Sequence, residues 1–221
     1  MLSVLKVVAV DGPAGAGKST ISKLVAAQLG LTYIDTGAMY RAVALKVLER
    51  RLPLTEEGII EAARDVEIDQ KSVDGVTKTY LDGRDVSTEI RTPDVSKIVS
   101  PVAKVGFVRQ RLTELQRKMA TRGGVIMDGR DIGTVVLPNA DVKIYLTATV
   151  EERARRRYEE LKAKGFDVDL QSIEKDIATR DKIDSEREIA PLKQADDAIL
   201  IDSTGLTIEE VTNKMIAIIG G

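Results

Sequence analysis

The stretch that decides the fold runs Gly12-Pro13-Ala14-Gly15-Ala16-Gly17-Lys18-Ser19. It meets the G-x-x-x-x-G-K-[ST] spacing of a phosphate-binding loop at every required position. Glycines let the backbone fold back so that several N–H groups point at an anion, and a following helix adds its positive end. We therefore predict that residues 12 to Thr20 bind the phosphates of a nucleotide. Lys18 would neutralise the β- and γ-phosphates, and Ser19 would supply a hydroxyl ligand to Mg²⁺.

An alternation of strands and helices follows the loop and indicates a parallel sheet covered on both faces. The alternative, a glycine-rich surface turn, is disfavoured because an apolar strand over residues 4–10 precedes the loop and an amphipathic helix over 19–28 follows it. Capping boxes, Thr149 with Glu152 and Thr207 with Glu210, fix two later helix starts. The remaining expected strands are 32–34, 125–127, 142–146 and 198–201, and the remaining expected helices are 38–50, 102–120, 150–162, 173–179 and 208–218.

Residues 66–90 break this alternation. The short runs 66–68, 79–81 and 86–90 are separated by the turn pairs Asp74-Gly75 and Asp82-Gly83, which is typical of a small antiparallel sheet. The insertion could be decoration, but ligands of parallel sheets bind beyond the carboxyl ends of the strands, so we favour a substrate-binding lobe. The expected fold class is therefore α/β: a three-layer phosphate-loop fold with a parallel five-stranded sheet, an inserted small antiparallel lobe and a short helical lid.

The composition excludes several kinds of chemistry. A chain of 221 residues with 43% hydrophobic content suffices for one large domain or for a core with an inserted lobe. It contains no Cys and no His, so disulfides, the usual zinc ligands and the usual general base are absent. The apolar stretch 4–10 is too short for a signal peptide or a membrane span, so we expect a cytoplasmic protein. A net charge of −2 argues against nucleic-acid or membrane partners.

The tetrapeptide Asp-Gly-Arg-Asp occurs twice, at 82–85 and at 128–131. Turn chemistry accounts for the first copy, which joins two short strands. The second copy follows an apolar strand, which places Asp128 where a carboxylate handles Mg²⁺ or a substrate and leaves Arg130 facing phosphate. A similar arrangement is expected at the end of the next strand, where Asp35 or Thr36 caps a helix and Arg41 lies in the first turns of that helix. A solvated helical arginine is the alternative for Arg41.

A basic cluster occupies residues 153–157, where Arg153 shares a helix face with Arg156 and Arg157. Such a cluster is usually a solvated face. Arg180 and Arg187 follow on the next segment, however, and this concentration in a chain of negative net charge favours a mobile lid that clamps transferring phosphates.

Four blocks together resemble the bacterial cytidylate kinases: residues 11–18, 35–41 and 128–136, and Arg187 ahead of 190–192. The resemblance runs from about residue 4 to 204. It implies transfer of the γ-phosphoryl group of ATP, with Mg²⁺, to CMP or dCMP, by a protein that we expect to be monomeric. It also implies a core of residues 1–35 and 120–221 with a lid at about 150–190, and a monophosphate-binding region at 36–119 whose inserted sheet spans about 64–91.

Site residues are carried over from the same resemblance. The family pattern gives Arg41, Arg109, Arg130 and Asp131 to the CMP phosphate and sugar, and it puts Thr36 and Ser100 near the base or its phosphate. It places Arg180, Asp184 and Arg187 near the sugar or base of the nucleotide, and Arg153 and Arg157 in the lid. The residues expected to take part in catalysis are Lys18, Arg130, Asp131, Arg153, Arg157 and Arg180.

Simple chemistry agrees with this expectation. A nucleoside monophosphate already presents an anionic oxygen nucleophile, so the reaction needs no catalytic base and suits a chain without His. Discrimination for cytosine needs an acceptor for its exocyclic amine, and Asp131 and Asp184 are the candidates. The alternatives are a kinase for UMP as well as CMP, a uridylate or adenylate kinase, and an ATP-binding module without transfer activity. A GTP switch is disfavoured because the only Asn-Lys pair, 213–214, continues as Met-Ile.

Overall fold

The computed structural model describes residues 6–73, 75–121, 123–163 and 165–221. Residues 4, 5 and 74, which belong to the predicted first strand and first turn, lie outside this range. The chain divides into two compact units, one formed by Met1–Leu31 with Gly124–Gly221 and the other by Thr32–Gly123. Within the described residues, no helix is both long enough and apolar enough to cross a membrane.

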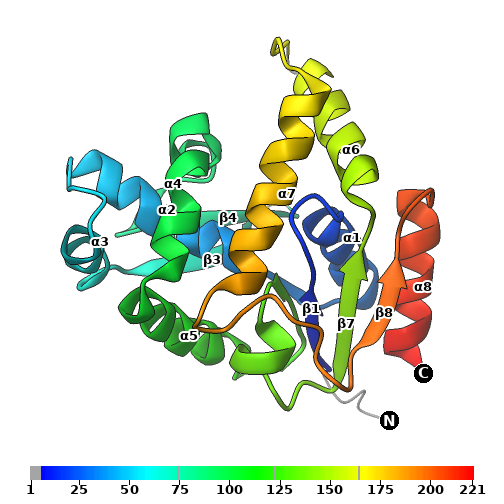
Figure 1. Cartoon of the computed structure of the whole chain (residues 1–221). Helices are drawn as coiled ribbons and strands as arrows, with labels where there is room; N and C mark the ends of the chain where they lie inside the picture. Colours follow the sequence, from blue (N-terminus) through cyan, green and yellow to red (C-terminus); the bar gives the residue numbers. More distant parts are fainter. Residues whose placement is uncertain (1–5, 74, 122, 164) are drawn as a thin grey trace. The chain divides into compact units, whose positions relative to one another are not determined.

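The larger sheet contains five strands in the order β2-β6-β1-β7-β8. Figure 1 labels β1, β7 and β8 of this sheet. β1 pairs in parallel with both β6 and β7, and β7 pairs in parallel with β8. This confirms the predicted five-stranded sheet. The carboxyl ends of β1 and β6 therefore lie at the same edge, and the glycine-rich loop begins there. The strand bounds are β1 Val7–Asp11, β2 Thr32–Asp35, β6 Val125–Gly129, β7 Val142–Thr147 and β8 Ile199–Asp202.

Four helices belong to the first unit: α1 (Lys18–Leu29), α6 (Val150–Ala163), α7 (Leu170–Glu186) and α8 (Ile208–Gly220). α1 packs against α8 and β6. α6 and α7 run side by side as a helical hairpin (Figure 1), with a small apolar cluster of Ala154, Ile173 and Ile177 buried between them. The predicted helix 173–179 is too short because its apolar periodicity marks only this contact. Asp169 caps α7 earlier, by accepting from the N–H of Ser172 at 2.7 Å.

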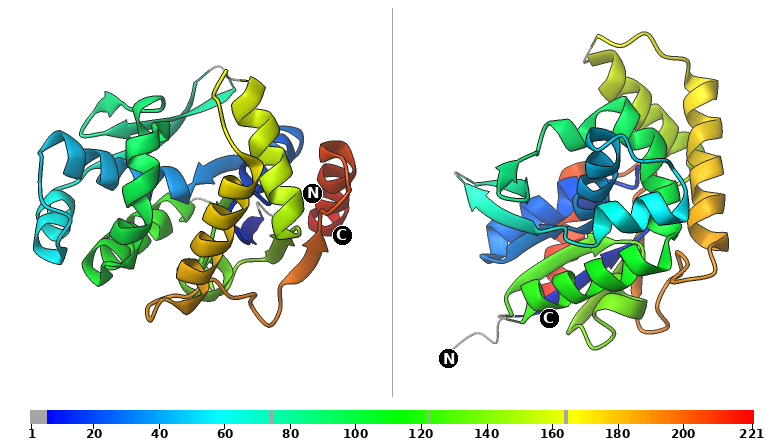
Figure 2. Two further views of the ribbon diagram at one scale, coloured as in Figure 1. Left: turned by 45° about the horizontal axis from the view of Figure 1, so that its top comes forward. Right: turned by 90° about the vertical axis from the view of Figure 1, so that its left-hand side faces the viewer.

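The second unit surrounds a separate apolar core, which includes Met39, Ile90 and Leu112. Its helices are α2 (Thr36–Glu49), α3 (Glu56–Ala63), α4 (Pro93–Lys104) and α5 (Gly106–Ala120). Its antiparallel sheet has the order β3-β4-β5, and the hairpin of β3 and β4 stands out in cyan and teal in Figure 2. The strand bounds are β3 Ile68–Val73, β4 Val76–Leu81 and β5 Arg84–Asp85.

Three predictions in this unit are wrong in detail. The single helix expected over 102–120 is two helices, because Val105 is extended (φ −70°, ψ 119°). The strand expected over 86–90 does not form: the short β5 ends before it, at Asp85, and a 3-10 turn, η1 (Glu89–Arg91), occupies its end. The strand expected at 66–68 starts at Ile68, and α3 was missed because it is only eight residues long. The expected turn at Asp82-Gly83 is confirmed, with φ of 49° and 82°.

Candidate functional site

The first residue of the phosphate loop, Gly12, has a backbone conformation that only glycine permits. Gly12 has a φ of 148°, and a Cβ added there would lie 1.9 Å from the carbonyl oxygen of Leu146. Gly17 has a φ of 90° and forms the N-cap of α1 without a side chain. The N–H groups of the first turn of α1 therefore meet no capping side chain, which is the arrangement that binds anions at helix N-termini.

Lys18 lies among the main-chain atoms of the same loop. Its buried Nζ donates hydrogen bonds to the carbonyl oxygens of Gly12 at 2.8 Å and Pro13 at 2.7 Å. Burial, and next the positive charge of Arg130, lowers the pKa of Lys18 well below its ordinary value. A bound polyphosphate would counter both effects, because nearby negative charge favours the protonated amine.

Ser19 and Asp128 meet at the carboxyl edge of the sheet. The Ser19 hydroxyl donates to Oδ2 of Asp128 at 2.7 Å, from the start of α1 to the end of β6. A hydroxyl and a carboxylate are both hard oxygen ligands of the kind that Mg²⁺ prefers. Within the described ranges, no group of three or more Asp or Glu residues could hold a metal ion. The pair itself offers two oxygen ligands of the kind that suit Mg²⁺.

Asp11, the last residue of β1, holds the segment that follows the second Asp-Gly-Arg-Asp copy. Its two carboxylate oxygens accept from the N–H groups of Ile132 at 2.8 Å and Gly133 at 2.7 Å. These two residues begin a π-helical turn, η2 (Ile132–Val136), that the sequence did not predict. Burial raises the pKa of Asp11 from its ordinary 3.8 to about 6, and the two backbone hydrogen bonds oppose that rise.

This raised pKa predicts how stability depends on pH. Between about pH 4 and pH 6 the native state binds the Asp11 proton more tightly than the unfolded chain does. The contribution of Asp11 to the free energy of unfolding therefore falls, by about 3 kcal/mol, as pH rises through that window. Urea titrations measure the free energy of unfolding of the wild type and of Asp11→Asn. We expect the wild-type value minus the variant value to fall by this amount between pH 4 and pH 7. A difference that stays constant with pH would contradict the assignment.

Two arginines and two aspartates form a network in the first unit, in which Asp131, Asp184 and Arg187 are buried and Arg130 is half-buried. Arg130 Nε contacts Asp184 Oδ2 at 2.8 Å, and Arg187 contacts Asp131 at 3.5 Å and Asp184 at 3.9 Å. Burial of Asp184 would raise its pKa, but Arg130 and then Arg180 and Arg187 outweigh it, so the pKa of Asp184 is lowered. The structure thus brings together four of the predicted substrate residues, with both candidate acceptors for a cytosine amine among them.

The predicted lid arginines differ in their surroundings. Arg153 is buried, donates to the carbonyl oxygens of Ala148 at 2.9 Å and Ala14 at 3.0 Å, and pairs with Asp181 of α7 at 2.6 Å. It therefore links α6 to the phosphate loop and to α7. Arg157 is exposed and pairs with Glu160 at 2.7 Å, while Arg180 is half-buried on α7.

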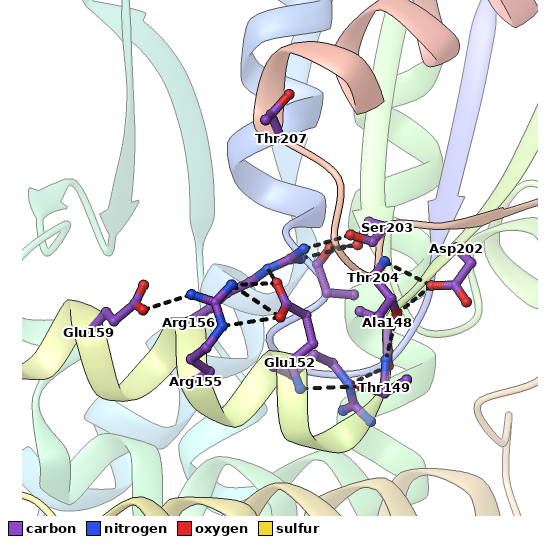
Figure 3. Close-up of polar contacts among 12 residues, drawn as sticks. Ala148, Thr149, Glu152, Arg155, Arg156, Glu159, Asp202, Ser203, Thr204 and Thr207 are labelled. Carbon is purple, nitrogen blue, oxygen red and sulfur yellow. Dashed lines mark hydrogen bonds and ion pairs between the residues drawn. The ribbon is translucent and has the colours of Figure 1, made fainter.

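Arg156 lies on α6 between Arg153 and Arg157, and it contacts the turn after β8 (Figure 3). Its guanidinium donates to the Oγ of Ser203 at 3.1 Å, to the carbonyl oxygen of Ser203 at 2.6 Å and to Glu152 at 2.8 Å. Only half of the predicted capping box at Thr149 forms, because the Thr149 N–H donates to Thr204 and the Glu152 carboxylate is taken by Arg155 and Arg156. The box at Thr207 and Glu210 is complete.

The remaining predicted substrate residues belong to the second unit. Thr36, the first residue of α2, is buried, and Ser100 is half-buried on α4. Arg41 donates to the carbonyl oxygen of Ile90 at 3.2 Å and to Ser96 at 2.8 Å. Arg109 is buried on α5, donates to Ala103 at 3.2 Å and lies over the ring of Tyr40 at 5.4 Å. None of the four is thus a fully solvated side chain, which for Arg41 disfavours the solvated-helix alternative.

Among the residues with specific contacts that were not predicted as site residues are Asp11, Asp181 and Gln70. Asp11 had a signal, since it immediately precedes the loop and follows a buried strand. Asp181 and Gln70 had none, because their partners Arg153 and Asp35 lie 28 and 35 positions away in the sequence.

A glycine-rich loop leading from the first strand of a parallel sheet into a helix, with a lysine, a serine and an aspartate at its mouth, defines a phosphate-loop protein that binds nucleotide phosphates. The family model described as cytidylate kinase matches residues 8–220. The chain belongs to the cytidylate kinase family, and its class is that of the nucleoside monophosphate kinases.

Relatives support this membership across almost the whole chain. The cytidylate kinase of Caldicellulosiruptor bescii is 57% identical over 210 residues, covering 95% of this chain and 93% of the relative. The cytidylate kinase of Alkaliphilus oremlandii is 55% identical over 217 residues, covering 97% of each. Among solved structures, an uncharacterized protein from Eubacterium ventriosum has a TM-score of 0.53 at 12% identity, covering 97% of this chain and 98% of that one, which is a likeness of fold alone.

Proposed function

We propose that this protein transfers the γ-phosphoryl group of ATP to CMP or dCMP, giving ADP and CDP or dCDP. The observation that carries the proposal is the family match over residues 8–220, in a chain whose loop surrounds Lys18 with main-chain groups. The substrates are small nucleotides, and the net charge of −2 offers no surplus for nucleic acid or membrane. The enzyme acts in the cytoplasm as a monomer.

The donor nucleotide is bound by the loop, residues 12–20. N–H groups at the start of α1 hold its phosphate oxygens, and Lys18 leaves the carbonyl oxygens of Gly12 and Pro13 to contact the β- and γ-phosphates. Ser19 and Asp128 would hold Mg²⁺ beside the phosphates. When bound, Mg²⁺ neutralises charge on the phosphate oxygens during transfer.

The acceptor is bound by arginine, hydroxyl and carboxylate side chains. Arg41, Arg109 and Arg130 contact the CMP phosphate, and Thr36 and Ser100 lie near the base or phosphate. The carboxylates of Asp131 and Asp184 accept from the N4 amine of cytosine or from the sugar hydroxyls, with Arg187 and Arg180 beside them. Uracil presents a carbonyl where cytosine presents the amine, so the same carboxylates would repel UMP.

Catalysis rests on alignment and charge. The monophosphate is itself an anionic nucleophile, so its oxygen attacks the γ-phosphorus without a protein base. Lys18, Arg130 and the arginines of the α6–α7 hairpin stabilise the charge that moves with the phosphoryl group. Closure of the hairpin excludes water, which would otherwise take the phosphoryl group.

The test is a coupled assay of ADP release with Mg²⁺ and ATP. CMP, dCMP, UMP, AMP and GMP are supplied at equal concentration, and a reaction without acceptor measures plain hydrolysis. The proposal expects turnover on CMP and dCMP well above all other acceptors. Comparable turnover on UMP would indicate a broader pyrimidine kinase, and turnover that does not depend on an acceptor would overturn the proposal.

A further inference from the structure

The segment from Asp35 to Arg41 carries two of the proposed acceptor residues, and its shape depends on one turn. Asp35 ends β2 and caps α2, with its Oδ1 accepting from the N–H of Ala38 at 2.8 Å. Its backbone is extended (φ −92°, ψ 94°), while Thr36 already belongs to the helix. The direction of Thr36 and of the first turn of α2 therefore follows from the orientation of the peptide group after Asp35.

Gln70 holds that peptide group from the inserted sheet. The Asp35 N–H donates to Oε1 of Gln70 at 2.9 Å, and Nε2 of Gln70 donates to the carbonyl oxygen of Asp35 at 2.7 Å. One side-chain amide thus pairs with both main-chain groups of one residue, as an adjacent strand would do. Thr79, opposite Gln70 in the β3–β4 ladder and buried, accepts from the same Nε2 at 3.4 Å and orients the amide.

Residues that follow the inserted sheet contact the same segment at different points. Arg91 of η1 pairs with the second carboxylate oxygen of Asp35 at 3.2 Å. Arg41, one and a half turns further along α2, donates to the carbonyl oxygen of Ile90 and to Ser96 of α4. The strand end, the helix cap and the arginine are therefore each held by a residue between 70 and 96.

We propose that the inserted sheet orients the acceptor-binding turn, and that Gln70 is the positioning residue through which it does so. This inference rests on the proposed function, since it assigns Thr36 and Arg41 to the acceptor. Gln70 touches no substrate in this account. It fixes the peptide after Asp35, and the fixed peptide directs Thr36 and the N–H groups of the first turn toward the acceptor phosphate. An insertion that could have been decoration thereby contributes to acceptor affinity.

The test compares steady-state constants for CMP and ATP in the wild type, Gln70→Ala and Ser72→Ala. Ser72 lies on the same strand, two residues along and exposed, so it is the matched control. Loss of two hydrogen bonds from Gln70 is expected to raise the KM for CMP about tenfold. The KM for ATP, the kcat at saturating CMP and the thermal midpoint are expected to stay close to those of the control.

A second variant, Gln70→Glu, keeps the size of the side chain and loses its donor. Its carboxylate would face the carbonyl oxygen of Asp35, so we expect a KM for CMP at least as high as that of Gln70→Ala. The inference is overturned if Gln70→Glu behaves as the wild type, if the KM for CMP is unchanged in Gln70→Ala, or if the KM values for CMP and ATP rise together. Failure of the proposed function itself is distinguishable, because the wild type would then fail to phosphorylate CMP.

Discussion

Replacing Lys18 with alanine is expected to lower kcat/KM for phosphoryl transfer by about 10²–10³-fold, the size of effect seen when one charge-stabilising group is removed from a transition state. The structure explains why no other group would compensate. Nζ is enclosed by the loop itself, where it donates hydrogen bonds to the carbonyl oxygens of Gly12 and Pro13. The alanine variant retains the N–H groups of α1, so it should still bind ATP, with weaker affinity.

The control for this prediction is Lys23→Ala, which removes an exposed lysine from the same helix. We expect the thermal midpoint of Lys18→Ala to stay near that of the wild type, because burial already disfavours the charged amine there. Coupled assays and thermal unfolding measure the two quantities separately. Equal activity of the two variants, or loss of activity only in proportion to lost folding, would contradict the assigned role.

The second large effect concerns the choice of base. One of the two carboxylates, that of Asp131 or that of Asp184, accepts from the N4 amine of cytosine. Replacing that aspartate with asparagine is expected to lower the ratio of kcat/KM for CMP to kcat/KM for UMP by about 10- to 100-fold. This range corresponds to the free energy that a hydrogen bond to a charged group contributes. The asparagine can turn its amide donor toward the uracil carbonyl, so activity with UMP should fall less than activity with CMP.

Both aspartates must be tested because the network couples them through Arg187. Asp184→Asn also removes the charge partner of Arg130, so it is expected to lower the stability of the fold as well. The ratio between two substrates is measured on the same folded enzyme and is insensitive to that loss. An unchanged ratio in both variants would exclude these carboxylates as the source of discrimination.

Much of the fold was predictable because its signals are local. The loop motif, the buried strand before it and the amphipathic helix after it each depend on neighbouring residues, and the structure has a strand at Val7–Asp11 and a helix at Lys18–Leu29 on either side of the loop. The predicted ends of helices were wrong where tertiary packing or the conformation of a single residue determines them. α7 continues to Glu186 through polar residues that have no apolar period, and α4 ends where Val105 turns extended ahead of Gly106.

The candidate site shows the same division. Lys18, Ser19 and Asp128 follow from motif spacing and from position at a strand end, and the structure places the last two in contact. The contacts that hold the site together follow from tertiary structure alone. Nothing in the sequence pairs Asp11 with Ile132 and Gly133, or Gln70 with Asp35, because each pair joins segments distant along the chain. Spacing indicates which residues carry chemistry, whereas the residues that position them need the fold.

The central claim is that the phosphoryl group passes from ATP to CMP rather than to water. The most direct measurement uses ATP labelled in its γ-phosphate, with Mg²⁺ and CMP, followed by separation of the labelled products. The account predicts that nearly all released label appears in CDP and that little label leaves ATP when CMP is omitted. Label that accumulates as inorganic phosphate at the same rate with and without CMP would contradict it.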